Sequence, residues 1–267
     1  MMDKLRRILA RTGAWIDDLL FPEKVTCLCC DYALGEADTD GLCRGCRCAL
    51  EGLAAAQEAR EAEQQETLPD GIDYIHAAYV YDGPVRKLVH RLKYESVRAA
   101  AVPLAKQMVF LPSGEEELIV PVPTDPRRER LRGFNQSALL AEHIAKELGM
   151  PMEKALTRVE ARRPQTGLPL CERRANLVGC MTASRAVRGK RVLLVDDVCT
   201  SGATVCEAAR ALREAGVVSV GVFAAARTAG DEDGSGDPFA PVFHGRANGE
   251  ISRKERGKTR KNMLNRL

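Results

Sequence analysis

Residues 191–204 read Arg-Val-Leu-Leu-Val-Asp-Asp-Val-Cys-Thr-Ser-Gly-Ala-Thr, a short apolar run that meets two acids and then a loop of small residues. Val192 to Val195 are four consecutive apolar residues, a pattern typical of a strand buried on both faces of a parallel sheet. Asp196 and Asp197 leave this strand at its carboxyl end, and ligands of open α/β sheets bind outside that end. Thr200 to Thr204 lead into an expected helix, whose N-terminal N–H groups and dipole favour an anion. The stretch therefore predicts a phosphate site.

The composition describes a chain that can bury a full α/β core and carry one small module beside it, since it has 267 residues of which 45% are hydrophobic. The formal net charge is only +3, so no global field indicates a nucleic acid partner. No apolar run approaches the roughly eighteen residues that a membrane span requires. Charged residues interrupt the first twenty positions, which excludes the apolar core of a secretory signal. These features predict a cytoplasmic protein without a membrane span.

Six of the ten cysteines fall within residues 27–48, a density that in a cytosolic chain favours a metal site over disulfides. Cys27 and Cys30 form one C-x-x-C pair, and Cys43 and Cys46 form a second. Two such pairs complete the closed four-thiolate shell of a structural zinc ion, which has no open position for catalysis. A redox dithiol and a site without metal are the alternatives. Two further thiols in the segment could substitute in the shell or be reactive, and these are Cys29 and Cys48.

Periodicity and composition divide the chain into four parts. Residues 1–22 predict an amphipathic helix, with apolar positions at helical spacing over 3–20, that packs on the rest of the protein; a membrane-surface or partner-binding helix is the alternative. Residues 23–70 form the zinc-ribbon module, ending in a linker or short helix over 49–67. Residues 71–228 form the main domain. Residues 229–267 form a polar tail that is expected to be disordered.

The main domain alternates strand and helix patterns, which predicts an α/β fold with a mostly parallel sheet. Strands are expected over 74–81, 118–123, 192–195 and 217–226. Helices are expected over 85–94, 97–110, 137–148 and 205–215. A polar segment over 157–180 lacks a clean period and is interpreted as a flap over a ligand.

Two basic segments stand out within this domain. The loop after residues 118–123 carries four arginines within six positions, each able to fork onto phosphate oxygens, and they are Arg127, Arg128, Arg130 and Arg132. Gly133 would let the backbone approach an anion closely. The alternative is a solvated loop. The charges over 86–91 are likewise interpreted as a solvated helix face.

Val192 to Thr204 resembles the signature of type I phosphoribosyltransferases, which bind 5-phosphoribosyl 1-diphosphate, and the match covers all of these positions. Further motifs resemble the ComF family in the same order. They are Cys27-x-x-Cys30, Leu42-Cys43-x-x-Cys46, Leu92-Lys93-Tyr94, Pro121-Val-Pro123, Arg132-Gly-Phe-Asn-Gln136, Gln165-Thr166 and Arg174-Ala-Asn-Leu177. ComF proteins are similar to the phosphoribosyltransferase part of amidophosphoribosyltransferases, preceded by a four-cysteine zinc ribbon. The resemblance implies a type I phosphoribosyltransferase fold behind a small zinc-ribbon module.

The resemblance also implies roles for individual residues. Asp196 and Asp197 would be the catalytic acids and would bind the ribose hydroxyls, while Mg²⁺ accompanies the diphosphate. The 5-phosphate would be held by the loop formed by Cys199, Thr200, Ser201, Gly202, Ala203 and Thr204. The diphosphate would meet Arg128, Arg132, the Gly133 backbone and Lys93.

Two functional hypotheses follow from the resemblance. In the first, the chain is an enzyme that transfers a phosphoribosyl group, its ligand being phosphoribosyl diphosphate or a related nucleotide-like molecule. In the second, it is a non-catalytic adaptor that binds such a ligand or single-stranded DNA and recruits a DNA-translocating helicase. ComF proteins of competent bacteria are implicated in DNA uptake, which fits either hypothesis. No glutaminase sequence precedes the domain, and the flap offers no recognisable base-recognition sequence, so neither ammonia supply nor a particular acceptor is expected.

Overall fold

The computed structural model describes residues 26–36, 38, 40–63, 68–158 and 179–228. The expected N-terminal helix over 3–20, most of the expected flap (159–178) and the expected tail (229–267) lie outside the described residues.

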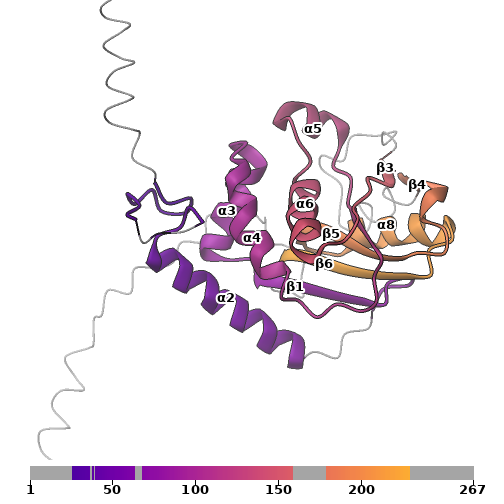
Figure 1. Ribbon diagram of the computed structural model, residues 1–267, viewed down its shortest axis with the longest axis horizontal. Coiled ribbons are helices and arrows are strands. Elements are labelled where there is room, and N and C mark those ends of the chain that lie inside the picture. Colours follow the sequence, from indigo (N-terminus) through magenta and orange to yellow (C-terminus); the bar gives the residue numbers. More distant parts are fainter. Residues whose placement is uncertain (1–25, 37, 39, 64–67, 159–178, 229–267) are drawn as a thin grey trace, which may run out of the picture. The chain divides into compact units, whose positions relative to one another are not determined.

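A four-stranded parallel sheet with the order β1-β6-β5-β2 forms the centre of the fold (Figure 1). Its strands are β1 (Tyr74–Val80), β2 (Leu118–Pro121), β5 (Arg191–Cys199) and β6 (Ser219–Arg227). The predicted parallel sheet is confirmed, and each of its strands coincides with an apolar run that the sequence marks. The central strands β5 and β6 are almost wholly buried, as expected for a sheet covered on both faces.

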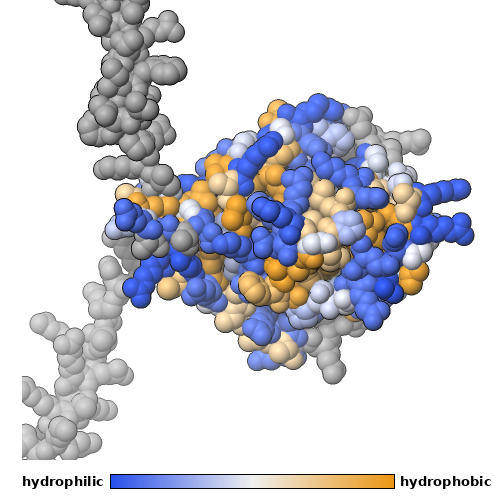
Figure 2. Space-filling view, viewed as in Figure 1, coloured by the Kyte–Doolittle hydropathy of each residue, from blue (hydrophilic) through white to orange (hydrophobic). Residues whose placement is uncertain are grey.

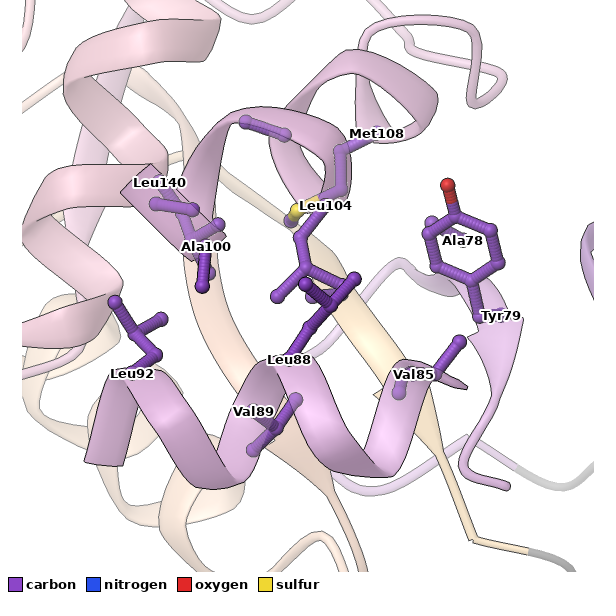
Figure 3. Packing of buried hydrophobic residues seen from close by; sticks show 14 of the residues in the cluster. Ala78, Tyr79, Val85, Leu88, Val89, Leu92, Ala100, Leu104, Met108 and Leu140 are labelled. Carbon is purple, nitrogen blue, oxygen red and sulfur yellow. The ribbon is translucent and has the colours of Figure 1, made fainter. Parts of the chain in front are cut away.

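Alternation along β5 divides the interior into two layers. Leu193 and Val195 belong to one core cluster, and Val192 and Leu194 to another, because successive side chains of a strand point to opposite faces. The first cluster includes residues of four helices, α2 (Arg44–Glu63), α3 (Gly83–Tyr94), α4 (Ala101–Met108) and α6 (Gln136–Leu148). The second includes residues of α8 (Ala203–Glu214). Figure 3 shows the apolar side chains of α3 and α4 turned toward one another in the first cluster.

The segment expected to be a linker or short helix over 49–67 is part of a longer helix, α2 (Arg44–Glu63). It begins inside the second cysteine pair and runs along β1, to which Glu61 attaches it. The Glu61 carboxylate accepts a hydrogen bond from the Ala77 N–H at 2.8 Å and contacts the His76 Nδ1 at 2.8 Å. Tertiary contacts with the sheet edge therefore stabilise a helix that its weakly amphipathic sequence alone does not specify.

The basic segment predicted as a loop is largely a helix, α5 (Pro126–Arg132). The Asp125 carboxylate accepts from the Arg127 N–H at 2.8 Å, and proline at the first helical position is already in helical conformation. Gly133 ends the helix in the left-handed region, with φ of 79°. The sequence prediction gave weight to the arginines and not to the helix-start residues Asp125 and Pro126 or the helix-end residue Gly133.

The shorter elements complete the described part of the chain. Strands β3 (Leu156–Arg158) and β4 (Met181–Ala183) form an antiparallel pair at the two ends of the expected flap. Single 3₁₀ turns occur at Arg98–Ala100 and Arg185–Val187. Hydrophilic residues interrupt the hydrophobic ones over the face drawn in Figure 2. Among the described residues, no helix is both long and apolar enough to cross a membrane.

Candidate functional site

Asp196 and Asp197 lie at the point where β5 extends beyond its neighbour β2. The last residue pair of β2 with β5 joins Pro121 to Val195, whereas the pairing of β5 with β6 continues to Cys199. The two acids are therefore inside the strand and not after it, because β6 still supplies hydrogen bonds there. Both residues are nonetheless nearly buried, at 7% and 9% exposed.

Three elements meet at this acid pair. The Asp196 Oδ1 accepts hydrogen bonds from the Ser137 hydroxyl of α6 at 3.0 Å and from the Asp197 N–H at 2.8 Å. The Lys93 ammonium of α3 lies 3.0 Å from the Asp197 Oδ1. This placement agrees with strand alternation, since Asp197 shares the face of Leu193 and Val195 that α3 and α6 cover. The structure thus brings Lys93 to the acids, as a contact of Asp197.

The burial of this cluster changes how its groups ionise. Burial and the neighbouring charge of Asp197 raise the pKa of Asp196 to about 7, although Lys93 and the Ser137 hydroxyl act in the opposite direction. Burial opposes the charge of Lys93, but the charge and hydrogen bond of Asp197 outweigh it, so the pKa of Lys93 is raised. Lys93 is therefore a permanent cation at neutral pH, and Asp196 is the titrating member of the site.

Ser137 is a site residue that the sequence reasoning missed. It lies in the first turn of α6, where the Asn135 side chain accepts from the Ser137 N–H at 3.0 Å and donates to the Val122 carbonyl at 2.9 Å. Asn135 thereby fixes the start of α6 against the end of β2. The signal that could have found Ser137 is its position just after the Arg132-Gly-Phe-Asn-Gln136 motif. The adjacent Gln136 side chain is also buried, and its Nε2 has no hydrogen-bond partner.

The loop from Cys199 to Thr204 joins β5 to α8. Cys199 is buried, Thr200 and Ser201 are exposed, and Gly202 takes the left-handed conformation with φ of 72° at the helix start. Helix α8 begins at Ala203, two residues before its predicted start, so Ala203 and Thr204 are in its first turn. The first N–H groups of a helix have no acceptor within it, and they are available to an anion at this point.

The basic residues of α5 differ in how far they are exposed to solvent. Arg127, Arg128 and Arg130 are exposed. Arg132 is half-buried: burial lowers the pKa of its guanidinium, whereas the charge of Asp197 acts to raise it, which indicates that Arg132 lies near the acid pair. The Gly133 N–H donates to the Glu129 carbonyl at 2.7 Å, as expected at a helix end. A contact between Gly133 and a diphosphate stays a prediction.

Four cysteines gather in the N-terminal module as the sequence predicts. The sulfur atoms of Cys27, Cys30, Cys43 and Cys46 all lie within 4.8 Å of one another, and those of Cys30 and Cys43 are 3.6 Å apart. Tetrahedral zinc with Zn–S bonds of about 2.3 Å requires sulfur separations of about 3.8 Å. The Cys27 sulfur also accepts from the N–H groups of Cys29 and Cys43, both at 3.4 Å. The donor set therefore fits a closed structural zinc site.

The two surplus thiols lie outside this cluster. Cys29 is buried against α3, where its sulfur contacts the Pro84 carbonyl at 3.8 Å, and burial raises its pKa to about 12. Cys48 is exposed on α2. Cys29 is thus placed as a buried residue that packs against α3, outside the four-cysteine cluster.

Ion pairs attach the cysteine module to the main domain. Asp31 lies 2.5 Å from the Arg91 guanidinium of α3, and Asp40 lies 2.6 Å from the Lys106 ammonium of α4. The module therefore contacts the helix that carries Lys93.

Comparison with known proteins identifies the family of the main domain. Residues 135–238 match the model of the phosphoribosyl transferase domain. The chain is 36% identical over 157 residues to the DNA utilization protein YhgH of Salmonella typhi, covering 55% of this chain and 69% of that protein. It is 29% identical over 211 residues to Competence protein F of Haemophilus influenzae, covering 70% of this chain and 91% of that protein. The chain belongs to the ComF family.

Among solved structures, this ComF chain is 26% identical to a glutamine phosphoribosylpyrophosphate amidotransferase of B. subtilis complexed with ADP and GMP. That alignment covers 48% of this chain and 26% of the other, with a TM-score of 0.36. The residues matched by the domain model include Ser137, both acids of β5, the loop after it and α8. The ComF chain therefore has a phosphoribosyltransferase-like fold, a parallel sheet flanked by helices, with a four-cysteine cluster ahead of it.

Proposed function

We propose that this ComF chain binds 5-phosphoribosyl 1-diphosphate together with Mg²⁺. The observation that carries the proposal is the buried acid pair near the carboxyl end of a central strand, which is followed within a few residues by a left-handed glycine and a helix N-terminus. Asp196 and Asp197 accept the ribose O–H groups, and the N–H groups and hydroxyls from Cys199 to Thr204 take the 5-phosphate.

The diphosphate in this proposal lies toward α3 and α5. Lys93 supplies a fixed positive charge at the acid pair, and Arg132 supplies a second one nearby. Arg128 is exposed on α5 and contacts the outer phosphate. The Gly133 N–H contacts it too once its hydrogen bond to the Glu129 carbonyl is broken. Mg²⁺, when bound with the ligand, neutralises diphosphate charge that these cations leave uncompensated.

If an acceptor is present, the C1–O bond to the diphosphate breaks and a bond from C1 to the acceptor forms. Positive charge develops on the ribose ring while the diphosphate leaves with the bonding electrons. Asp196 and Asp197 hold the ring in place, and Lys93 and Arg132 stabilise the leaving group. Cys27, Cys30, Cys43 and Cys46 would hold a zinc ion in a closed shell, which would stabilise the fold and offer no open position for this step.

The cellular role within this proposal is DNA uptake during competence, in the cytoplasm, where thiolates remain reduced for the zinc site. Its support is the family, whose relatives carry the names DNA utilization protein and Competence protein F.

Titration calorimetry with phosphoribosyl diphosphate, with and without Mg²⁺, tests the binding. We expect Asp197→Asn to weaken binding about tenfold to a hundredfold, since a hydrogen bond to a charged group contributes roughly 1.5–3 kcal/mol. Glu142→Gln, which removes an exposed carboxylate of α6, is the matched control and leaves affinity unchanged. Equal affinity of the wild type and Asp197→Asn would exclude this site. Diphosphate release in the presence of an acceptor panel then separates an enzyme from a ligand sensor.

The second candidate function is an adaptor that binds single-stranded DNA and recruits a helicase. The observation that favours it is the exposure of Arg127, Arg128 and Arg130 on one short helix. Phosphate contacts by such cations release counterions, so affinity should fall steeply as salt rises. A fluorescence-anisotropy titration of labelled oligonucleotide at several salt concentrations tests this; affinity that does not change with salt would exclude it.

A further inference from the structure

Exposed cations gather at the amino ends of the sheet strands, whereas the acid pair lies near their carboxyl ends. Two segments supply these cations, one that connects β4 to β5 and one that precedes β3. The Ser184 N–H donates to the Ala155 carbonyl at 2.8 Å, so the next residue on each side, Arg185 and Lys154, continue the β3–β4 pair. The exposed cations are Lys154, Arg185, Arg188 and Lys190.

Val218 adds an exposed apolar side chain beside these cations. It is 61% exposed, and its N–H donates to the Lys190 carbonyl at 2.9 Å. The Arg188 side chain lies across Gly216, where an added Cβ would meet the Arg188 Cγ at 3.0 Å. Val218 therefore borders two of the cations. The amino-end patch consists of Lys154, Arg185, Arg188, Lys190 and Val218.

The amino-end patch holds positive charge that its surroundings do not neutralise. Within the part of the chain that the structure describes, its four cations form no ion pair and no side-chain hydrogen bond. Acids at the same end of the sheet already have partners, since Asp73 pairs with Arg213 at 2.7 Å and the Glu117 side chain accepts from the Arg191 N–H at 3.2 Å. Glu153, an exposed acid that adjoins the patch in sequence, offsets at most one of the four charges.

The backbone beneath the amino-end patch is fixed. Val187 is fully buried, and its carbonyl accepts from the Lys190 N–H at 3.1 Å. The Ser184 hydroxyl accepts from the Ala186 N–H at 3.3 Å. A partner therefore meets cations on an ordered segment, so binding does not include the entropic cost of ordering that segment.

Cations around an apolar side chain suit a protein segment that carries both carboxylates and an apolar residue. Carboxylates form charge-assisted hydrogen bonds with Lys and Arg, and an apolar contact between such pairs excludes water from them. Single-stranded nucleic acid fits less well, because proteins that bind it stack its bases on aromatic rings and the amino-end patch has none.

We propose that the amino-end patch docks an acidic segment of another protein, with an apolar side chain of that segment against Val218. Along β5, Asp196 lies six residues beyond Lys190, or about 20 Å at the rise of a strand. A docked segment therefore leaves the acid pair open to its own ligand. The docking does not depend on the proposed function.

Fluorescence anisotropy with the full chain tests this docking. One probe is a short labelled peptide of aspartate and glutamate that also carries leucine, and the other has serine in place of leucine. The wild type is expected to bind the leucine peptide more tightly. Val218→Ser should abolish this preference and leave the affinity for the serine peptide unchanged, because it removes only the apolar contact.

Charge reversal tests the cations of the same patch. Arg185→Glu/Lys190→Glu should weaken binding of the leucine peptide about tenfold or more, because two attractions become repulsions. Lys87→Glu/Lys146→Glu is the matched control. It changes the net charge equally at exposed lysines of α3 and α6 and should change the affinity less than about twofold.

The contrary results are distinct. No peptide binding by the wild type at low salt overturns the docking, and so does equal affinity for the two peptides, which reflects charge attraction alone. Oligothymidylate that binds more tightly than the leucine peptide and loses affinity in Arg185→Glu/Lys190→Glu would make the patch a nucleic acid surface instead. Displacement of the peptide by phosphoribosyl diphosphate would place the peptide at the acid pair and also overturn the docking. Failure of phosphoribosyl diphosphate to bind overturns only the proposed function.

Discussion

Burial and the charge of Asp197 raise the pKa of the Asp196 carboxyl group from an ordinary 3.8 to about 7. Between these two values the folded state holds a proton that the unfolded state releases, so stability falls as pH rises through this window. Asp196→Asn removes that penalty. We expect it to stabilise the fold by about 1–3 kcal/mol at pH 8 and by much less at pH 4.5, measured by urea unfolding at both values.

The control for this pH prediction is Asp70→Asn, which alters an exposed turn residue and should change stability little at either pH. An equal effect of Asp196→Asn at pH 4.5 and pH 8 would contradict the prediction.

Lys93 and Asp197 form the most buried ion pair at the site, with side chains 21% and 12% exposed. Removing one partner leaves the other charge buried without compensation, which costs more than the pair contributes. Lys93→Met should therefore destabilise the fold by about 2–4 kcal/mol. The double variant Lys93→Met/Asp197→Asn should recover more than half of that loss in a urea-unfolding double-mutant cycle. Purely additive costs would show that the two groups do not interact.

At the scale of elements, the sequence predicted the strands well and the contacts between elements poorly. The apolar run Val192 to Val195 marked β5, but its extension to Cys199 depends on pairing with β6, which a local pattern does not contain. The acids and the loop were found because they form one contiguous motif. Ser137 was missed because its contact with Asp196 joins residues 59 positions apart. Helix α5 was missed because charge obscured the Asp-Pro start and the glycine end.

Substitution of two glycines tests where a helix requires glycine and where it does not. Gly202 is the N-cap of α8 and has a φ of 72°, so Gly202→Ala should cost about 1–2 kcal/mol and weaken ribose 5-phosphate binding, because a Cβ disfavours that conformation. Gly52 lies in the exposed face of α2 with open space around it, and Gly52→Ala should stabilise by about 0.5–1 kcal/mol without affecting binding. Thermal unfolding and calorimetry measure both. Opposite signs in the two variants are expected, and destabilisation by both would contradict this account.

At the scale of the whole described chain, the cysteine module and the main domain share one interior. Cys27, Leu42 and Leu50 belong to the same core cluster as Leu88 and Leu92 of α3. The pairs of Asp31 with Arg91 and of Asp40 with Lys106 add polar contacts at the surface of this junction. A change in the module therefore reaches α3, and through it the position of Lys93.

Removal of the metal tests that connection. Without zinc, the four cysteines lose the ion that would hold them together, so the cluster should open and expose part of the shared core. Protein purified without chelator should contain about one zinc ion per chain. Chelation should lower the Tm of the whole chain by about 4–10 °C and weaken binding of ribose 5-phosphate, because α3 loses its support. Cys43→Ser should reproduce both effects, whereas Cys48→Ser, at an exposed thiol outside the cluster, should retain the metal and the Tm. Loss of zinc with unchanged Tm and unchanged binding would show that the module folds independently of the phosphoribosyltransferase-like part.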